Sequence, residues 1–447
     1  MKNLLNENIK NLAYKLPKPL YVVGGFVRNF LFNGKPSKDI DLASSLPIEI
    51  LKENLTEFGF TVIGEYKRTE TLLFSDGVQK YEYTAFRSEV YKKGGSHTPI
   101  KTFLVDDIEV DAKRRDFKCN AVYYDIKKGE IVDVLGGAKD IENKVLDTVI
   151  APEEVFSHDG LRLMRLARFV GELGFTPTKE VLQAAKKHAK NILDVSKERI
   201  FAELKMILVA DKKYSFSQKN GHYLAIKVLD ETGVLDYIFP DLTLGRGMEQ
   251  RKDYHKYDVL EHSLRAFLYA PKDLRLFALL HDIGKPFAMN KDGRYKLHAV
   301  YGEDLVKKAL KDILADNKTV EKAVFLTKNH MLDKNCEMSE EKVRAFIVEN
   351  TENIKDLLAI MQADHSAYKD QLGVCPTVKK WQAIIDKMKK EKAPFSLKEL
   401  NITAQNLIDI GFKGDKIGKT LRKLLVHCAV YPKDNKREKL VRLALEF

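Results

Sequence analysis

The sequence predicts an α+β protein in which a mixed α/β N-terminal region precedes regions built from helices alone. Near the N-terminus, strand-like apolar runs alternate with a Gly-Gly turn, a helical pattern and an Asp-Gly turn signal. Beyond about residue 150, apolar residues recur mainly with helical spacing. The 447 residues exceed what one core usually holds, since a domain averages about 150 residues. We therefore expect several domains in one chain.

The composition favours a globular protein with a polyanionic partner. Hydrophobic residues make up 44% of the chain, and 76 Lys and Arg against 64 Asp and Glu give a formal net charge of +12. The four cysteines form no C-x-x-C pair, which argues against a zinc knuckle or a disulfide framework. The chain start lacks a signal-peptide pattern, and no run approaches about 18 apolar residues. We expect a cytoplasmic protein that does not enter a membrane.

The first candidate site begins where an apolar strand, Tyr21 to Val23, meets Gly24 and Gly25 and then a helix. Glycines at such a turn let backbone N–H groups approach a phosphate, and the helix N-terminus adds partial positive charge. Arg28, one turn into the helix, can reach the same phosphate. The stretch therefore predicts a nucleotide phosphate site.

Two carboxylates follow at once, Asp39 and Asp41. On a strand the period of two puts both on one face, where they can share divalent cations such as Mg²⁺. Either motif alone usually marks only a turn or a solvated edge. Their order and closeness favour a single site.

Together the two motifs resemble the nucleotidyltransferase head of the class II tRNA nucleotidyltransferase and bacterial poly(A) polymerase family, with its Gly-Gly-x-Val-Arg-Asp and Asp-x-Asp sequences. The resemblance implies a polymerase β-like head in which Asp39 and Asp41 are catalytic and hold Mg²⁺. Asn29 departs from the family pattern. It stands in place of an Asp that supports the arginine.

A helix over 47–58 and a hairpin come next. Strand-like runs at 71–74 and 81–87 flank Asp76-Gly77, which predicts a type I′ turn. The second run brings Glu82 toward Asp39 and Asp41, and a two-metal site needs a further carboxylate. Asp116 competes for that role, and a structural Glu on a sheet face is an equally good reading of Glu82.

The segment 111–121 resembles the family's Arg-Arg-Asp-Phe-Thr-Ile-Asn-Ala motif through Arg114, Arg115, Asp116 and Asn120, with Lys118 and Cys119 as substitutions. Paired arginines are often only a solvated face. Beside a triphosphate they are expected to neutralise phosphate or to hold Asp116.

The spacing of apolar and basic residues over 153–169 predicts one helix, in which arginines recur every three residues: Arg162, Arg165 and Arg168. Asp159 stands one turn before Arg162, so a carboxylate acceptor lies beside a bidentate donor. Cytosine and adenine present an amino donor beside a ring acceptor, whereas uracil and guanine present the reverse order, so the pair can select C and A. The four residues match the family's nucleotide-selecting motif position by position.

A second constellation contains His262, the adjacent His281 and Asp282, and Asp364. A His-Asp pair on an apolar helix is often structural. The ordered set resembles the metal signature of HD-domain phosphohydrolases, and His298 and His330 fall where some subtypes place extra ligands. Imidazole with carboxylate suits Mn, Ni, Co, Fe or Mg.

These patterns predict four segments: a nucleotidyltransferase head at 1–150, a helical neck at 151–245, an HD domain at 246–392 and a C-terminal helical tRNA-binding segment at 393–447. Basic helices after residue 397 can hold RNA phosphates by shape.

The resemblance implies addition of CCA, or part of it, to tRNA 3′ ends from CTP and ATP. Poly(A) polymerase is the close alternative. An HD phosphohydrolase with a nucleotide-binding head, and a non-catalytic RNA-binding module, are the alternatives from other classes.

Overall fold

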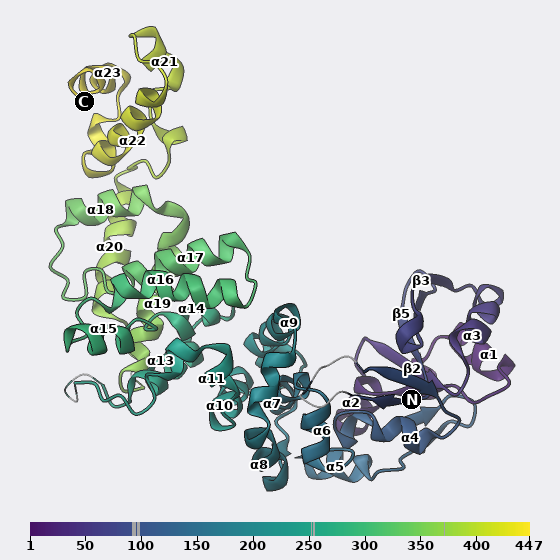
Figure 1. Ribbon diagram of the computed structural model, residues 1–447. Helices are drawn as coiled ribbons and strands as arrows, with labels where there is room; N and C mark the ends of the chain where they lie inside the picture. The colour runs from purple at the N-terminus through teal and green to yellow at the C-terminus, as the bar shows by residue number, and fades with distance from the viewer. Residues whose placement is uncertain (92–94, 96–98, 252, 254, 371) are drawn as a thin grey trace. The chain divides into compact units, whose positions relative to one another are not determined.

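The computed structural model describes residues 1–91, 95, 99–251, 253, 255–370 and 372–447 (Figure 1). They form two compact units, Met1–Pro240 and Asp241–Phe447, each with its own core. The first unit is mixed α/β and the second consists of helices, in agreement with the predicted fold class. The finer division into four segments stays a prediction.

The first unit is built on a seven-stranded sheet with the order β3-β4-β5-β2-β1-β8-β9. Every neighbouring pair is antiparallel except β2 and β5, which run parallel. The sheet strands are β1 (Tyr21–Val23), β2 (Ile40–Ser44), β3 (Thr61–Tyr66), β4 (Thr71–Ser75), β5 (Lys80–Ala85), β8 (Tyr123–Asp125) and β9 (Glu130–Val132). Two small ribbons pair β6 (Arg87–Val90) with β7 (Lys101–Leu104) and β10 (Val145–Leu146) with β11 (Thr176–Pro177).

Helices surround the sheet and continue beyond it to residue 240. They are α1 (Glu7–Lys15), α2 (Gly25–Asn33), α3 (Ile48–Leu55), α4 (Ile108–Lys113), α5 (Gly137–Asn143), α6 (Pro152–His158), α7 (Leu161–Leu173), α8 (Lys179–Lys187), α9 (Lys197–Leu208), α10 (Gly221–Glu231) and α11 (Val234–Ile238). Buried apolar residues of α7, including Leu163, Met164 and Leu166, form the core of the helical part. The predicted helix over 47–58 is confirmed as α3 followed by a 3₁₀ turn, Thr56–Phe58.

The second unit packs its helices around buried side chains such as Leu279, Leu280 and Trp381. Its helices are α13 (Val259–Tyr269), α14 (Arg275–Leu280), α15 (Lys285–Asp292), α16 (His298–Asp312), α17 (Asn317–Asn329), α18 (Glu340–Glu349), α19 (Thr351–Ala367), α20 (Pro376–Lys390), α21 (Ala404–Asp409), α22 (Asp415–Val430) and α23 (Arg437–Glu446). Helix α12 (Pro240–Thr243) lies at the boundary between the units. Within the described ranges, no helix has the length and apolar character needed to cross a membrane.

The predicted hairpin is confirmed, but its turn differs from type I′. Strands β4 and β5 pair from Thr71 opposite Thr84 to Ser75 opposite Lys80, which leaves a four-residue connection. Only Gly77 in that connection has a positive φ, whereas type I′ requires it at both central residues. The Asp76 carboxylate accepts the N–H groups of Val78 and Gln79 instead, so a side chain closes the longer loop.

Candidate nucleotide-binding site and candidate metal centre

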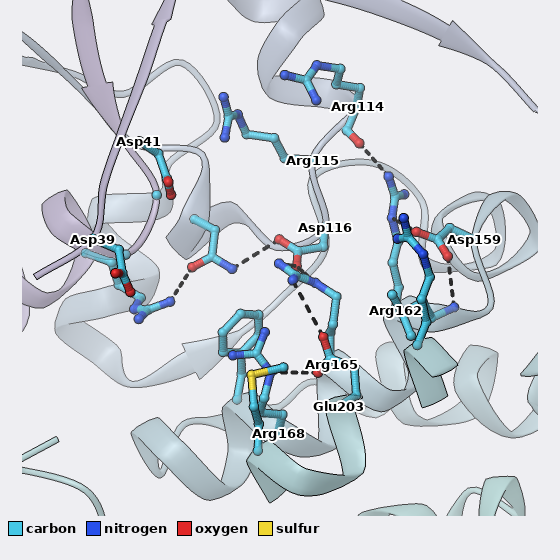
Figure 2. A pocket seen from close by; sticks show the side chains of 18 of the residues that line it. Asp39, Asp41, Arg114, Arg115, Asp116, Asp159, Arg162, Arg165, Arg168 and Glu203 are labelled. Carbon is cyan, nitrogen blue, oxygen red and sulfur yellow. Dashed lines mark hydrogen bonds and ion pairs between the residues drawn. The ribbon is translucent and has the colours of Figure 1, made fainter. Parts of the chain in front are cut away.

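A cavity of about 660 Å³ lies in the first unit, between residues of the sheet and of the helices that follow it. It collects nearly all of the head residues predicted from the sequence. Lining it are Gly24, Gly25, Arg28, Asp39, Asp41, Arg114, Arg115, Asp116, Asn120, Asp159, Arg162, Arg165 and Arg168. Figure 2 shows Asp39 and Asp41 on one side of the cavity and Asp159 with Arg162 on the other.

The glycine turn has the form that the sequence predicts. Strand β1 ends at Val23, Gly24 adopts φ 76° and ψ −140°, and α2 begins at Gly25. A Cβ atom on Gly24 would stand 2.9 Å from Oδ2 of Asp41, and its positive φ disfavours any other residue. The turn therefore brings bare backbone next to a candidate metal ligand.

Asp41 lies on β2, but Asp39 immediately precedes that strand. The two carboxylates therefore reach the cavity from a strand and from the bend before it, and not from one strand face as predicted. Glu82 lines a neighbouring cavity that also contains Asp41, and the two residues are paired in register across β5 and β2. Burial and the nearby Glu82 raise the pKa of Asp41 to about 6, while Arg115 opposes the shift.

The three carboxylates Asp39, Asp41 and Glu82 offer oxygen ligands, which suit Mg²⁺. Burial next to a second carboxylate disfavours the charged form of Asp41, and a divalent cation removes that penalty. The residues present therefore fit Mg²⁺.

Asp116, the competitor of Glu82, is fully occupied inside the protein. Its Oδ2 accepts Nε of Arg165 at 2.7 Å, and its Oδ1 accepts the Asn120 amide at 3.1 Å and the Phe117 N–H at 2.8 Å. Burial alone would raise the pKa of Asp116, but Arg165 and Asn120 lower it below its usual range. This carboxylate holds the cavity wall together, which favours Glu82 as the third head carboxylate.

The arginine pair has a different partner from the predicted one. Both side chains bind Asp111: Nε of Arg114 lies 2.7 Å from its Oδ1, and Nη2 of Arg115 lies 3.0 Å from its Oδ2. The Tyr123 hydroxyl also donates to Oδ2 of Asp111, at 2.7 Å. Burial opposes ionisation of Asp111, but the two guanidinium groups lower its pKa to about 2. The alternative in which the pair holds Asp116 is wrong, because Arg165 occupies that carboxylate. The alternative in which the pair neutralises phosphate stays a prediction.

The predicted single helix over 153–169 is two helices, α6 and α7, with a break at Asp159 and Gly160. Asp159 is extended, and its Oδ1 accepts the N–H of Leu161 at 2.8 Å. A Cβ atom on Gly160 would stand 2.3 Å from the Asn191 carbonyl oxygen, so glycine permits this close approach. Helical periodicity alone misses the break because apolar spacing continues across it.

Asp159 and Arg162 nevertheless lie side by side, with Nε of Arg162 3.8 Å from Oδ2 of Asp159. The Arg162 guanidinium also donates hydrogen bonds to the backbone carbonyls of Arg114 and Val155, and it lies over the aromatic ring of Tyr91. These contacts fix the guanidinium in one orientation beside the carboxylate. The hydrogen-bonding edge of a bound base would therefore face an acceptor, Asp159, and a donor, Arg162, that are already held in position.

The other two arginines of α7 are not free cations. Arg165 binds Asp116, and Nε of Arg168 lies 2.7 Å from Oε2 of Glu203. A second carboxylate, Glu172, accepts from Arg168 at 3.3 Å, and the guanidinium lies 4.4 Å from the Phe169 ring centroid. The predicted basic stripe is therefore a set of ion pairs on the cavity wall, buried at Arg168 and half-buried at Arg165.

Arg28 is the exception among these arginines. Its side chain is only 2% exposed, and its partners are the neutral groups of Asn29, Asn120 and Tyr214 at 2.5–3.3 Å. No carboxylate of the described residues forms an ion pair with it. A buried cation without a counter-charge is unfavourable, and an anion in the cavity would supply one. Asn29 occupies the supporting position predicted for it but adds no negative charge.

Sequence reasoning did not assign roles to Asp111, Glu203 or Tyr214. Asp111 stands three and four residues before the arginine pair, a spacing typical of ion pairs on a helix, so a signal was present. Glu203 and Tyr214 come from α9 and the loop beyond it, and nothing in their local sequence points to α7.

The second unit brings the predicted metal ligands together. One ligand atom each from His262, His281, Asp282 and Asp364 lie within 4.8 Å of one another. A second group joins the same Asp282 to His298 and His330. Among the described residues these are the only two groups of three or more such atoms, and the head carboxylates converge less closely.

The orientations of three imidazole rings indicate which of their nitrogen atoms carries no hydrogen. Nδ1 of His281, His298 and His330 each lie 2.7 Å from the backbone carbonyl three residues earlier. A carbonyl only accepts, so each Nδ1 carries the hydrogen and each Nε2 is left as an acceptor in the neutral ring.

The Nε2 atoms of His298 and His330 then face each other at 3.2 Å, and both approach Oδ1 of Asp282, at 3.1 and 3.5 Å. Acceptors gathered this closely repel unless a cation lies among them. Imidazoles that donate Nδ1–H to a carbonyl are the usual form of metal-ligating histidine. The site fits one divalent cation in each group, with Asp282 common to both.

Two further side chains support the cluster. Nζ of Lys285 lies 2.6 Å from Oδ2 of Asp282 and donates to Gln250, and the Tyr368 hydroxyl donates to Asp364 at 3.1 Å. Burial alone would raise the pKa of Asp282, but the Lys285 ammonium group lies against the carboxylate and lowers that pKa. The central ligand is therefore a carboxylate.

The folds and the two sites define a class of protein: a nucleotidyltransferase head joined through helices to an HD domain. Three family models match the chain in that order: "Poly A polymerase head domain" at 20–147, "Probable RNA and SrmB- binding site of polymerase A" at 174–244, and "HD domain" at 254–368. The chain belongs to the class II tRNA nucleotidyltransferase and bacterial poly(A) polymerase family.

Similar proteins of known name agree with this family assignment. A CCA-adding enzyme of a Geobacillus species is 35% identical over 224 residues, 49% of this chain and 50% of that protein, so the match spans about half of the relative. A CC-adding tRNA nucleotidyltransferase of Thermus thermophilus is 26% identical over 435 residues, 93% of this chain and 91% of that protein. The crystal structure of the Bacillus stearothermophilus CCA-adding enzyme in complex with CTP superposes with a TM-score of 0.64 at 21% identity, covering 99% of this chain and 98% of that one.

Proposed function

We propose that this protein adds CCA, or part of it, to the 3′ ends of tRNA, using CTP and ATP. The tRNA 3′ oxygen forms a bond to the α-phosphorus of the nucleotide, the bond to the β-phosphate breaks, and pyrophosphate leaves with a proton lost from the hydroxyl. A tRNA substrate makes the cytoplasm the proposed location.

The observation that carries this proposal is the charge arrangement of the head cavity. At one side the Gly24-Gly25 turn and the uncompensated Arg28 form a phosphate site, next to Asp39 and Asp41. Across the cavity Asp159 and Arg162 present an acceptor beside a donor. A nucleoside triphosphate has the matching order of charges and hydrogen-bonding groups.

The residues divide the work by position. Asp39, Asp41 and Glu82 would hold Mg²⁺, which neutralises charge on the triphosphate and on the leaving pyrophosphate. Arg28 binds phosphate, and Arg114 and Arg115 extend the positive wall from their anchor on Asp111. The Arg165–Asp116 and Arg168–Glu203 pairs keep α7 in place, so the Asp159–Arg162 pair meets the base in a fixed direction.

The direct experiment offers the protein three tRNA transcripts, lacking CCA, lacking only the final A, or complete, with each nucleoside triphosphate separately and with CTP and ATP together. We expect C addition to the first, A addition to the second and none to the complete tRNA. Repeated A addition to complete tRNA would identify the poly(A) polymerase alternative, and addition of neither nucleotide would refute the proposal.

A second activity is favoured by the metal cluster. The two ligand groups sharing Asp282 fit a phosphohydrolase centre, in which divalent cations supply the Lewis acidity that activates water. Water would add across a phosphoester bond to give a phosphate and an alcohol, as on a 2′,3′-cyclic phosphate at a damaged RNA end. Lys285 would keep Asp282 ionised and oriented.

A further inference from the structure

A groove of about 510 Å³ lies in the second unit between α19 and α20 (Figure 1). It is separate from the metal cluster, because no ligand of either group lines it. Its surface is mainly apolar and includes Ile354, Leu358, Val378, Ile385 and Phe395. Neither the proposed nucleotide addition nor the proposed phosphoester hydrolysis uses this groove.

Both helices present residues to the groove at the same spacing. The two stripes are Thr351, Lys355, Leu358 and Gln362 on α19, and Val378, Gln382, Ile385 and Lys389 on α20. Each stripe advances by four, three and four residues, which keeps it on one side of its helix. Two such stripes side by side form a seam into which a third helix can pack. Each stripe is about 17 Å long, which matches about three turns of a partner helix.

The apolar surface continues past one end of the groove. In the connection between the two helices, Leu372 is 79% exposed and Val374 is 64% exposed. Gln362 holds this connection in place, because its Nε2 donates to the Gly373 carbonyl at 3.0 Å and its Oε1 accepts the Cys375 N–H at 2.9 Å. Exposed apolar side chains next to an apolar groove are typical of a surface that a protein partner covers.

The charges at the groove have one sign. Lys355 and Lys389 line it, and no carboxylate among the described residues lines it or forms an ion pair with either lysine. Of the carboxylates nearby in the sequence, Asp356 pairs with a lysine of α17 at 2.5 Å, Asp386 accepts a glutamine amide at 3.1 Å, and Glu352 lines a neighbouring cavity. A partner with carboxylates beside its apolar face would complement both lysines.

We propose that this groove docks an α-helix of a partner protein, with its apolar stripe between α19 and α20 and acidic residues beside Lys355 and Lys389. An extended peptide offers side chains with a period of two, which does not match the spacing of the two stripes. A basic helix would be repelled by the two lysines. The surface is therefore an interaction site for an acidic amphipathic helix, in addition to the two chemical sites of the chain.

The test measures binding of a fluorescein-labelled synthetic peptide to the full-length protein by fluorescence anisotropy. The peptide has about 15 residues and forms a helix with leucines at the four-three-four spacing and glutamates on both sides of that stripe. We expect Lys355→Glu/Lys389→Glu to weaken its binding by about tenfold or more, and Ile385→Ser to weaken it by about fivefold. The control Lys311→Glu/Lys318→Glu should change it less than about twofold. All four lysines are exposed, so these substitutions should preserve the fold, which circular dichroism checks.

A second peptide, with lysines in place of the glutamates, should bind Lys355→Glu/Lys389→Glu more tightly than it binds wild type. Equal affinity of the acidic peptide for wild type and for Lys355→Glu/Lys389→Glu would overturn the proposal. Equal binding of an acidic peptide with the same composition but scrambled leucines would also overturn it, because attraction to a chain of net charge +12 would then explain the binding. A wild-type protein that binds no acidic peptide overturns it as well. If charge reversal then changes the mass of that protein in light scattering, the groove is occupied by a second copy of this chain.

Discussion

The head cavity and the HD cluster both contain buried aspartates, but they use them in opposite ways. In the head, Asp111 and Asp116 are neutralised by arginines, and the cavity keeps an uncompensated cation in Arg28. In the HD cluster, carboxylates and bare imidazole nitrogens converge around Asp282, and Lys285 is the cation that contacts it. Around Arg28 the head cavity is built to receive an anion, whereas the cluster around Asp282 is built to receive cations.

This difference separates structural from functional carboxylates. Arginine partners lower the pKa of Asp111 to about 2, whereas burial beside Glu82 raises that of Asp41 to about 6. A carboxylate that is already paired with arginines inside the protein has little capacity to bind a further ligand. A carboxylate that is repelled by a neighbouring carboxylate is stabilised most when a metal ion binds to it. The opposite pKa shifts of these two head carboxylates therefore agree with the contacts that distinguish them.

The largest expected effect is on Asp39 and Asp41. Replacing either by Ala should lower the rate of nucleotide addition by about 1000-fold or more, because the residues that would hold Mg²⁺ at the triphosphate are lost. Binding of tRNA, measured by filter retention, should stay within a few-fold, since RNA affinity comes mainly from basic surfaces elsewhere. The exposed Glu53→Ala serves as control, and substantial turnover in both Asp variants would sink the assignment.

The next effect concerns stability. Asp111→Asn removes a buried carboxylate shared by two guanidinium groups, and should lower the free energy of unfolding at pH 7 by about 2 kcal/mol. Because the folded pKa, about 2, is below the usual 3.8, this contribution is present above about pH 4 and is lost as the pH falls toward 2.

Denaturant unfolding at several pH values checks this prediction. The wild-type protein should lose stability more steeply than Asp111→Asn between about pH 4 and 2. The exposed Asp106→Asn should behave like wild type. Parallel pH profiles for wild type and Asp111→Asn would show that the arginine pair is anchored differently.

A smaller effect is expected on base selection. Asp159→Ala removes the acceptor beside Arg162 and should reduce the preference for CTP over UTP by about tenfold, more than it weakens triphosphate binding. The measurement is kcat/KM for each nucleotide on tRNA lacking CCA, with the exposed Asp194→Ala as control. Full preference for CTP in Asp159→Ala would show that other groups read the base.

The smallest effect follows from Asn29. Its amide oxygen contacts Arg28 at 2.9 and 3.0 Å without neutralising it, so Asn29→Asp should weaken CTP binding about three- to tenfold. Asn33→Asp adds the same charge at the far end of α2 and should have little effect. Equal or tighter CTP binding in Asn29→Asp would mean that Arg28 does not bind the phosphate as a free cation.

The sequence allowed correct predictions for features that depend on neighbouring residues, and it failed for features that depend on residues far away in the chain. The strand, the Gly24-Gly25 turn and the helix, the hairpin, and the gathering of the HD-domain histidines and aspartates were predicted, because each depends on short spacings or on a distinctive residue type. Metal binding by those histidines and aspartates stays a prediction. The break at Asp159 was missed because its cause, the contact of Gly160 with Asn191, lies about thirty residues away in the chain.

The same reason explains the errors within the head site. Periodicity shows where Arg165 and Arg168 point but not that Asp116 and Glu203 neutralise them from 49 and 35 residues away. The partner of a charged side chain depends on tertiary packing. The sequence therefore predicted which residues line the cavity more reliably than which of them remain available to a ligand.

The central claim is that the two sites are chemically independent, and one paired measurement tests it most directly. Metal content by elemental analysis and nucleotide addition to tRNA are measured on the same preparations of wild type, of His281→Ala/Asp282→Ala, and of the control His427→Ala/Asp434→Ala, whose side chains pair at 2.8 Å outside the cluster. We predict that the cluster variant alone loses its bound transition metal and that all three proteins add nucleotides at similar rates. Equal transition-metal content in the cluster variant and wild type, or loss of nucleotide addition from a folded cluster variant, would contradict the account.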